Sequence, residues 1–333
     1  MRWGVAGYGD VVERRVLPAL RALGEEPAYL WGRDPERAAR VAARHGVPAA
    51  GGDESALVRG VDAVYVATPV VRHVPLARAA AAAGLPVLVE KPLAGALATA
   101  TATGALDGPC AGVAYYRRLA PAVRRLRAEL DGWTPARVDV RFRCAFDPGP
   151  DHPMRWRTDP AVSGGGVLAD AGSHRIDLLV LLFGRPAVVR GSLTHRFPRG
   201  AERRAEVELR WASGVRARLL AEWSNEPPVD RMEFTGGGRT LTLDPLDSGR
   251  LRSRGPDGSW EATLPPAANP HEPLVADFVD AVRTGRPPVC PVADARLVDE
   301  VIVAAGDPAA ASRGQRRDGR RSGKGPLGRA RRP

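Results

Sequence analysis

The amino-acid sequence predicts an α/β fold in which a doubly wound parallel sheet is followed by an α+β domain built on a largely antiparallel open sheet. Apolar strands and helices alternate from the N-terminus, as they do in parallel sheets. From about residue 137 the strands instead alternate apolar and polar residues. The chain has 333 residues, more than one hydrophobic core usually organises. We therefore expect domains at residues 1–115 and 116–305, followed by a tail at 306–333.

The first half predicts four apolar strands, at residues 2–6, 28–31, 61–68 and 86–90. Apolar residues at helical spacing predict helices from Val11 to Leu23, from Pro35 onward, and over about residues 74–83. Such alternation predicts a parallel sheet, which binds its ligands at the carboxyl ends of the strands.

The second half predicts half-solvated antiparallel strands. They lie at residues 137–146, 206–211, 215–223 and 232–243, the last interrupted by three glycines. A final helix is expected at about residues 272–284, beginning near His271 and folding back on either domain.

Composition excludes several protein classes. No apolar run approaches the roughly 18 residues of a membrane-spanning helix, so we expect a cytoplasmic protein without a membrane partner. Three widely spaced cysteines, Cys110, Cys144 and Cys290, fit neither a disulfide framework nor a metal site, and we expect them to be reduced and mostly buried.

Much of the positive charge lies in the tail. Residues 306–333 hold eight Arg and one Lys against two Asp, which is +7 of the formal +11. Their Gly, Ser, Ala and Pro content is typical of a disordered extension. A polyanion-binding role is our last-ranked hypothesis, and we do not expect a nucleic-acid partner.

A glycine turn after the first strand predicts a dinucleotide site. Gly7, Tyr8, Gly9, Asp10 and Val11 would bring backbone N–H groups to a pyrophosphate at a helix N-terminus. Val12 stands where this fingerprint normally has Gly or Ala. At the end of the second strand, Arg33 suits a ribose 2′-phosphate and favours NADP over NAD, although Asp34 could instead bind the 2′-hydroxyl.

Lys91 is the one lysine outside the tail, where Lys324 is the other. It directly follows a strand at the predicted ligand edge. A desolvated ammonium can exchange a proton whereas arginine stays charged, so this choice indicates chemistry, the alternative being an ordinary surface lysine.

A third candidate site follows Gly164, Gly165 and Gly166, which would permit close backbone approach to a ligand. Spacings of four and three put Asp170, His174 and Asp177 on one helical face. A carboxylate and an imidazole one turn apart can bind a substrate hydroxyl and remove its proton. The alternative is a solvated polar face.

Together these residues resemble the glucose–fructose oxidoreductase / inositol dehydrogenase / rhizopine catabolism family (Gfo/Idh/MocA), over nearly all of residues 1–305. The motifs are the glycine turn, Gly32–Arg37, Thr68-Pro69 with His73, Glu90-Lys91-Pro92, Tyr116–Arg118, Trp156-Arg157, the three glycines and Asp170-x-Gly172-x-His174-x-x-Asp177. The resemblance implies a Rossmann domain and a second domain whose open sheet often forms a homodimer or homotetramer interface. Val12, and Val70 where the family commonly has Asn, depart from the pattern on the cofactor side.

The resemblance also implies roles. Lys91 would polarise or protonate the carbonyl oxygen, His174 would exchange the hydroxyl proton, and Asp170 would orient the substrate. The implied substrate-binding residues are Tyr116, Arg117, Trp156, Asp170 and His174. The cofactor-binding residues predicted from the motifs are Gly7, Tyr8, Gly9, Asp10, Val11, Arg33, Thr68, Pro69, His73, Glu90 and Lys91.

The leading hypothesis is an NAD(P)-dependent dehydrogenase or reductase that transfers a hydride between its nicotinamide and a secondary alcohol or ketone of a sugar, cyclitol or related polyol. A nicotinamide-binding regulatory or sensor protein without turnover is the alternative.

Overall fold

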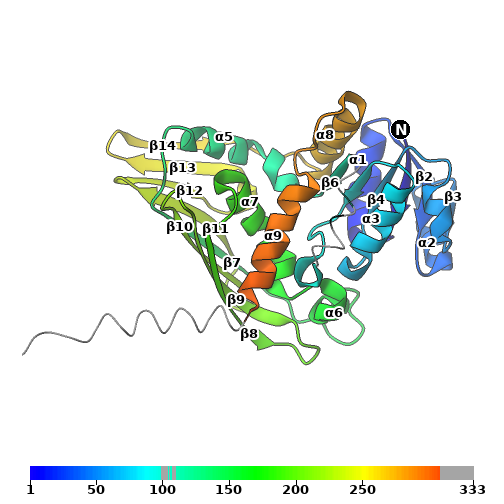
Figure 1. The fold of residues 1–333 in the computed structure, drawn as a ribbon, viewed down its shortest axis with the longest axis horizontal. Coiled ribbons are helices and arrows are strands. Elements are labelled where there is room, and N and C mark those ends of the chain that lie inside the picture. The colour runs from blue at the N-terminus through cyan, green and yellow to red at the C-terminus, as the bar shows by residue number, and fades with distance from the viewer. Residues whose placement is uncertain (99–103, 105, 107–109, 308–333) are drawn as a thin grey trace, which may run out of the picture.

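Two sheets with helices between them make up the fold in a computed structural model, which describes residues 1–98, 104, 106 and 110–307. Figure 1 shows the eight-stranded sheet on one side, the parallel sheet on the other, and the helices α7 (Ser173–Phe183) and α9 (Val292–Ala305) between them. The fold class predicted from the sequence is confirmed. Apart from Gly306 and Asp307, the predicted tail lies outside the described residues.

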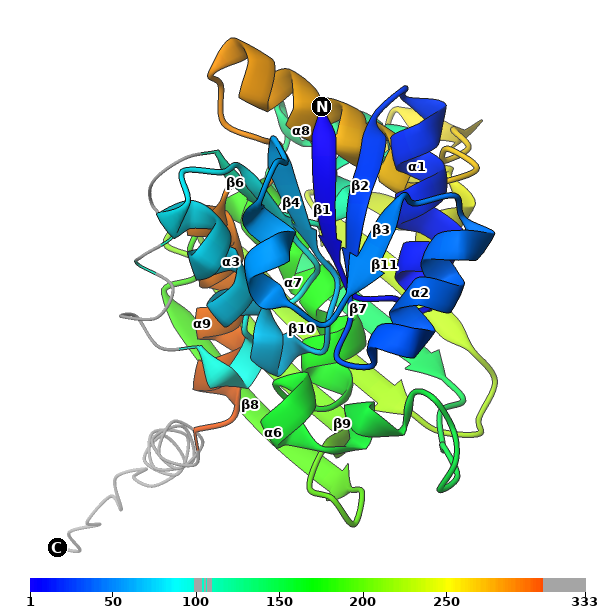
Figure 2. The ribbon, with the colours of Figure 1, turned by 90° about the vertical axis from the view of Figure 1, so that its right-hand side faces the viewer.

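The first sheet is parallel and doubly wound, with strand order β3-β2-β1-β4-β5-β6. Its strands are β1 (Arg2–Ala6), β2 (Glu26–Trp31), β3 (Ala49–Gly51), β4 (Ala63–Val66), β5 (Val87–Val89) and β6 (Ala111–Val113). Helices α1 (Leu17–Ala22), α2 (Pro35–Arg44) and α3 (His73–Ala82) connect them, and Figure 2 shows β4, β1, β2 and β3 side by side. Since the order reverses beside β1, the ligand edge lies at the carboxyl ends of β1 and β4.

The second sheet has strand order β14-β13-β12-β11-β7-β10-β9-β8. Its strands are β7 (Arg137–Cys144), β8 (Val188–Arg196), β9 (Glu202–Arg210), β10 (Arg216–Trp223), β11 (Val229–Gly236), β12 (Arg239–Leu243), β13 (Arg250–Gly255) and β14 (Gly258–Thr263). The expectation of antiparallel pairing is wrong for one pair: β7 and β10 run parallel. Val138 and Val140 of β7 are buried while Arg137 and Arg141 are exposed, so one face of the strand is solvated as predicted.

The remaining helices join the two sheets. Helix α8 (His271–Thr284) begins where predicted and packs on the first sheet, with Phe278 buried 5.9 Å from the Trp3 ring. Helix α9, which the sequence interpretation missed, packs against α7 and β8. Helix α5 (Pro121–Leu130) lies against the second sheet, whereas the short α6 (Pro160–Ser163) contacts the helical turns Val70–Arg72 and Gly95–Leu97. The last two helices of the described chain thus pack against different sheets, α8 against the first and α9 against the second.

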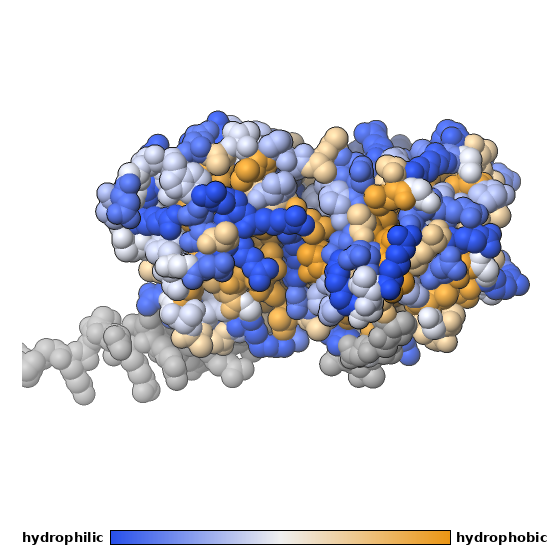
Figure 3. Space-filling model, turned by 90° about the horizontal axis from the view of Figure 1, so that it is seen from above, coloured by the Kyte–Doolittle hydropathy of each residue, from blue (hydrophilic) through white to orange (hydrophobic). Residues whose placement is uncertain are grey.

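The predicted helix 11–23 begins irregularly, since Val12–Val16 at its start is a π-helical turn. All three cysteines are free; Cys290 is buried, and Cys110 and Cys144 are partly buried. Among the described residues, no helix is long and apolar enough to cross a membrane, and no cluster of metal-binding side chains occurs. Hydrophilic residues cover most of the face shown in Figure 3, with hydrophobic groups scattered between them.

Candidate active site

The glycine turn after β1 has the geometry of a close backbone approach. Gly7 has φ 114°, and a Cβ atom there would lie 2.4 Å from the Ala67 carbonyl oxygen, so no other residue fits. Gly9 borders open space, and its carbonyl accepts the Glu13 N–H at 3.1 Å as the helix begins. The turn therefore offers helix N-terminal N–H groups beside open space.

Val12, the departure from the fingerprint, is fully buried at this helix start. The Leu17 N–H bonds to the Val12 carbonyl, an i→i+5 bond that widens the turn. A wider turn gives the branched side chain room against the sheet. The glycine turn keeps its close approach to Ala67 despite the substitution.

At the end of β2, aromatic and cationic groups gather beside the turn. The Tyr8 ring lies over Gly32, where a Cβ atom would meet it at 2.1 Å, and the Arg37 guanidinium lies 5.0 Å from that ring. The Asp34 carboxylate accepts the Arg37 backbone N–H at 3.0 Å and caps α2. Arg33 is exposed. Asp34 is thus committed to the helix, while the Arg33 guanidinium faces solvent.

Two predicted cofactor residues lie between β4 and α3: Thr68 follows the strand, and His73 begins the helix. The buried Thr68 hydroxyl has no partner in the described part of the chain. His73 is buried, with Nε2 2.8 Å from the Thr68 carbonyl oxygen and Nδ1 2.9 Å from that of Pro92. Burial lowers its pKa, although both carbonyl oxygens favour the protonated ring. Since both ring nitrogens are used within the protein, His73 holds two site loops together.

Glu90 is the buried centre of a hydrogen-bonded group behind Lys91. Its Oε1 lies 2.9 Å from both the Tyr65 hydroxyl and His271 Nε2, and its Oε2 accepts the Lys91 backbone N–H at 3.3 Å. Burial alone would raise the pKa of Glu90, but the His271 hydrogen bond and charge, with Lys91 and Tyr65, lower it to about 2. The carboxylate therefore stays ionised and fixes the strand end that carries Lys91.

Lys91 and Asp170 meet between the domains. Lys91 Nζ lies 3.0 Å from the Asp170 carbonyl oxygen and 3.3 Å from its Oδ1. Arg157 Nη1 binds the other carboxylate oxygen at 2.9 Å. Burial lowers the pKa of Lys91, partly opposed by the Asp170 charge, while Lys91 and Arg157 lower the pKa of Asp170 against its own burial. An ammonium with a lowered pKa suits proton exchange.

His174 follows Asp170 by one helical turn and is 6% exposed. Its ring makes edge contacts with Tyr115 at 5.9 Å and Tyr116 at 5.3 Å, and its buried Nδ1 has no partner among the described residues. Burial, followed by the charges of Arg117, Lys91 and Arg175, holds the pKa of His174 well below its ordinary value. The imidazole is neutral at pH 7 and can accept a proton.

The third residue of the predicted stripe, Asp177, is structural. It is fully buried and pairs with Arg118 at 2.7 Å. The alternative of a solvated polar face is excluded, because His174 and Asp177 are buried and Asp170 is only partly exposed. These residues contact segment 91–118, so they do share one face.

The three glycines serve packing. A Cβ atom on Gly164 would lie 2.7 Å from the Ala94 carbonyl oxygen, and one on Gly166 would lie 2.1 Å from that of Glu202. The buried Glu202 carboxylate accepts the N–H groups of Gly166 and Leu168. The expectation that these glycines approach a ligand is wrong for Gly164 and Gly166, whose close neighbours are protein backbone.

The predicted substrate residues lie around His174 and Asp170. Tyr116 packs between the His174 and His271 rings, and Trp156 stacks on Arg157, the partner of Asp170. Arg117 is buried and binds Asp247 through Nε at 2.7 Å and through Nη2. Sequence reasoning missed the roles of His271, Arg157, Arg175 and Asp247. The position of His271 at a helix start was visible, but its partner Glu90 lies 181 residues away.

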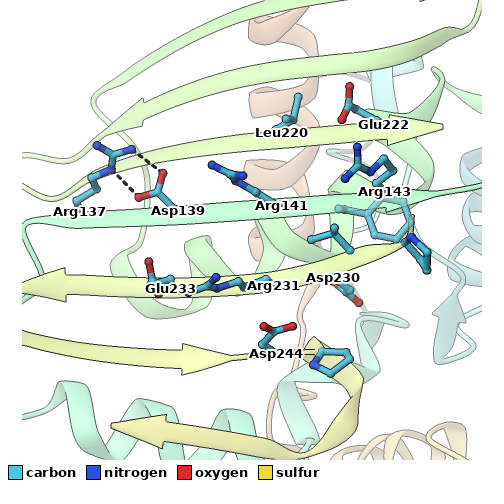
Figure 4. A pocket seen from close by; sticks show the side chains of 14 residues that line it. Arg137, Asp139, Arg141, Arg143, Leu220, Glu222, Asp230, Arg231, Glu233 and Asp244 are labelled. Atoms are coloured by element: carbon cyan, nitrogen blue, oxygen red, sulfur yellow. Dashed lines mark hydrogen bonds and ion pairs between the residues drawn. The ribbon is translucent and has the colours of Figure 1, made fainter. Parts of the chain in front are cut away.

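A separate hollow of about 580 Å³ lies on the open face of the second sheet. Figure 4 shows charged side chains of β7, β10 and β11 lining it, including Arg141, Glu222 and Glu233. Neither Lys91 nor His174 lines it. Subunit contact through this face remains a prediction.

Comparisons with known proteins match both halves of the chain. The family described as oxidoreductases with an NAD-binding Rossmann fold matches residues 1–106, and the GFO/IDH/MocA C-terminal domain matches residues 122–242. The chain is 30% identical over 301 residues to D-xylose 1-dehydrogenase (NADP(+)) 2 of Haloferax volcanii, covering 86% of this chain and 91% of that protein. It is 34% identical over 304 residues to dTDP-3,4-didehydro-2,6-dideoxy-alpha-D-glucose 3-reductase of Streptomyces violaceoruber, covering 85% of each.

Solved structures show the same fold. UDP-N-acetylglucosamine 3-dehydrogenase from Acidithiobacillus ferrooxidans superposes with a TM-score of 0.77 at 25% identity, covering 92% of this chain and 96% of that one. Levoglucosan dehydrogenase in complex with NADH gives 0.81 at 20% identity, covering 94% and 97%. With both domains matched in order and the motifs in place, the chain belongs to the Gfo/Idh/MocA family of NAD(P)-dependent oxidoreductases.

Proposed function

We propose that the protein transfers a hydride reversibly between NADP(H) and a secondary alcohol or ketone carbon of a sugar, cyclitol or related polyol. The observation that carries this proposal is the 3.0 Å contact of the Lys91 amine with Asp170, one helical turn before the neutral, buried His174 imidazole. An amine and an imidazole from different domains are thereby available to one substrate hydroxyl. The relatives named as sugar dehydrogenases and reductases support the substrate class.

The residues at the edge of the first sheet fit a dinucleotide. Gly9 borders open space at the helix N-terminus, and Thr68 keeps a buried hydroxyl without a protein partner in the described chain. Backbone N–H groups of residues 7–11 would hold the pyrophosphate, and Thr68, Pro69, Glu90 and Lys91 would border the nicotinamide. When bound, the cofactor accepts or supplies the hydride.

Within this proposal, Lys91 and His174 handle the proton and the oxygen charge. In the oxidation direction, neutral His174 takes the hydroxyl proton, and the Lys91 ammonium stabilises the oxygen through an N–H that Asp170 leaves unused. Asp170 and Arg157 keep the ammonium in place. In the reduction direction the proton returns to the carbonyl oxygen from the same pair.

The preference for NADP is supported at the end of β2. Arg33 faces solvent, and the Arg37 guanidinium lies over the Tyr8 ring at the same place. Asp34, the alternative partner for a ribose 2′-hydroxyl, caps α2 instead. Two guanidinium groups at the end of β2, where the neighbouring Asp34 carboxylate caps α2, suit a 2′-phosphate.

The test is a screen of pentoses, hexoses and cyclitols with NADP⁺ and NAD⁺, read from nicotinamide absorbance, with Lys91→Ala beside the wild type. The variant should lose about 10²–10⁴ in rate while binding the cofactor almost as before. Arg124→Ala, an exposed residue on α5, is the control. Unchanged turnover in Lys91→Ala contradicts the assigned role. Cofactor binding without turnover of any compound favours the sensor alternative.

A further inference from the structure

Buried side-chain nitrogen atoms without hydrogen-bond partners in the described part of the chain gather around Tyr116, next to His174. Arg117 Nη1, His174 Nδ1 and His271 Nδ1 are each buried and have no hydrogen-bond partner in the described part of the chain. The three residues surround Tyr116, whose ring lies 5.3 Å from each imidazole and 5.0 Å from the Arg117 guanidinium. Buried polar groups are normally paired, so such a cluster points to a ligand that is bound during function.

Arg117 is the charged member of this cluster. It is 7% exposed, and Asp247 binds its Nε and Nη2, which leaves Nη1 alone without an acceptor. A buried guanidinium N–H without a partner is costly, and an anionic oxygen is its preferred acceptor. The Tyr116 ring is a shared neighbour of this guanidinium and of the His174 ring.

The neighbouring carboxylates are already occupied. Asp170 binds Lys91 and Arg157, Asp230 binds Arg175 at 2.6 Å, and Asp247 binds Arg117. Glu90 binds His271. Arg15 acts electrostatically on both Tyr116 and Asp247, yet its side chain makes no ion pair within the described residues. Cationic donors therefore remain in excess on this side of the imidazole.

We propose that the substrate carries an anionic group, a carboxylate or a phosphate, which Arg117 binds through Nη1, with Arg15 beside it, while the reacting carbinol carbon lies at Lys91 and His174. This inference rests on the proposed function, because Lys91 and His174 mark the reacting carbon. It narrows the substrate from sugars and polyols in general to sugar acids, sugar phosphates or nucleotide sugars.

The subsite has a chemical consequence for His174. Arg117 is the largest of the charges that lower the pKa of His174. A bound anion would offset that charge and raise the pKa of the imidazole toward neutral pH, where a general acid–base group works best. Substrates without the anion would leave the pKa of His174 low and the neutral imidazole a weaker base.

The first experiment compares sugars that differ in charge. NADPH-loaded enzyme is titrated with D-glucose, D-glucuronate, glucose 6-phosphate and UDP-glucose while nicotinamide fluorescence is followed, and oxidation of each is measured with NADP⁺. At least one anionic compound should bind roughly tenfold or more tightly than glucose. Preference for glucuronate identifies a carboxylate, and preference for either phosphate compound identifies a phosphate. If no anion binds more tightly than glucose, the proposal is overturned.

The second experiment removes the guanidinium. Arg117→Met should abolish the tenfold advantage of the anion, whereas Arg124→Met, which removes an exposed charge on α5, should retain it. Because Arg117→Met leaves Asp247 without its partner, the double variant Arg117→Met/Asp247→Asn keeps the test valid if the single variant fails to fold.

Equal weakening of glucose binding and anion binding by both Arg117 variants would contradict the subsite. Arg117-dependent anion binding without turnover would refute the proposed function alone, and turnover of neutral sugars without anion preference would refute this inference alone.

Discussion

Lys91 Nζ lies 3.0 Å from the main-chain oxygen of Asp170 and 3.3 Å from its Oδ1, although the two residues are 79 positions apart. Lys91 lies two residues after β5 of the first sheet, and Asp170 belongs to the helical turn that precedes α7. Their contact joins the two domains at the point where the chemistry is proposed.

Asp170→Asn should shift the basic limb of the pH profile. The Asp170 charge raises the pKa of Lys91 against its burial, so removing that charge lets the pKa fall further. The loss of kcat/KM at high pH should therefore begin at lower pH than in the wild type. Asp139→Asn on the exposed sheet face is the control. An unmoved basic limb in Asp170→Asn would show that Lys91 does not determine it.

Burial of the His174 imidazole should lower the free energy of unfolding at acid pH. Its folded-state pKa lies well below 6.5, so the unfolded chain binds a proton first as pH falls through 6.5. The wild type should then lose free energy of unfolding below pH 6.5, by up to about 1.4 kcal/mol per pH unit for this one proton. Urea unfolding at pH 7.5 and 5.0 measures the loss.

The matched variant for that measurement is His174→Gln, which should lose less stability between the two pH values. His73 contributes in the same direction, since burial lowers its pKa also, and it remains in both proteins. Equal losses in wild type and variant would mean that His174 binds its proton over the same pH range in the folded and the unfolded chain. His174→Gln should also lower the oxidation rate by about 10²–10⁴.

The first sheet could be predicted from the sequence because its signals are local. Apolar strands, the glycine turn and the helix at Pro35 each lie within a few residues of one another, and topology rules then fix where strand ends meet. Lys91 could be identified for the same reason, because it is the one lysine outside the tail and directly follows a predicted strand. Its partner Asp170 was identified separately, through the spacing to His174.

What the sequence could not show depends on contacts between distant segments. The parallel pairing of β7 with β10 joins residues about 80 positions apart, and the Glu90–His271 pair joins residues 181 apart. Gly166 was interpreted as a ligand contact because its neighbour Glu202 lies on another element, 36 positions later. No periodicity within one segment carries such information.

Arg33→Ala should change cofactor selectivity. If the guanidinium binds a 2′-phosphate, the variant should bind NADPH at least about tenfold more weakly, while NADH affinity changes little. Arg37→Ala should act in the same direction and also uncover the Tyr8 ring. Titration of nicotinamide fluorescence measures the affinity of the wild type and of each variant for both cofactors. Tighter binding of NADH than NADPH by the wild type would overturn the preference, and the exposed Arg40→Ala is the control.

Glu90→Gln tests whether the buried group behind Lys91 positions the amine. The ionised carboxylate receives hydrogen bonds from Tyr65, His271 and the Lys91 backbone, and an amide can keep only part of this set. Losing a buried, charge-assisted pair should cost about 2–3 kcal/mol in the free energy of unfolding. Since the folded pKa of about 2 lies below the ordinary value of 4.5, this carboxylate stabilises the wild type above pH 4.5 and less as pH falls toward 2. Glu90→Gln should lack that part of the acid dependence of the free energy of unfolding.

The same variant should show a larger fall in kcat than in cofactor affinity. His271→Gln removes the partner and leaves the carboxylate, so it should lower kcat in the same way. Unchanged kcat in both variants would show that the Glu90–His271 pair is structural only.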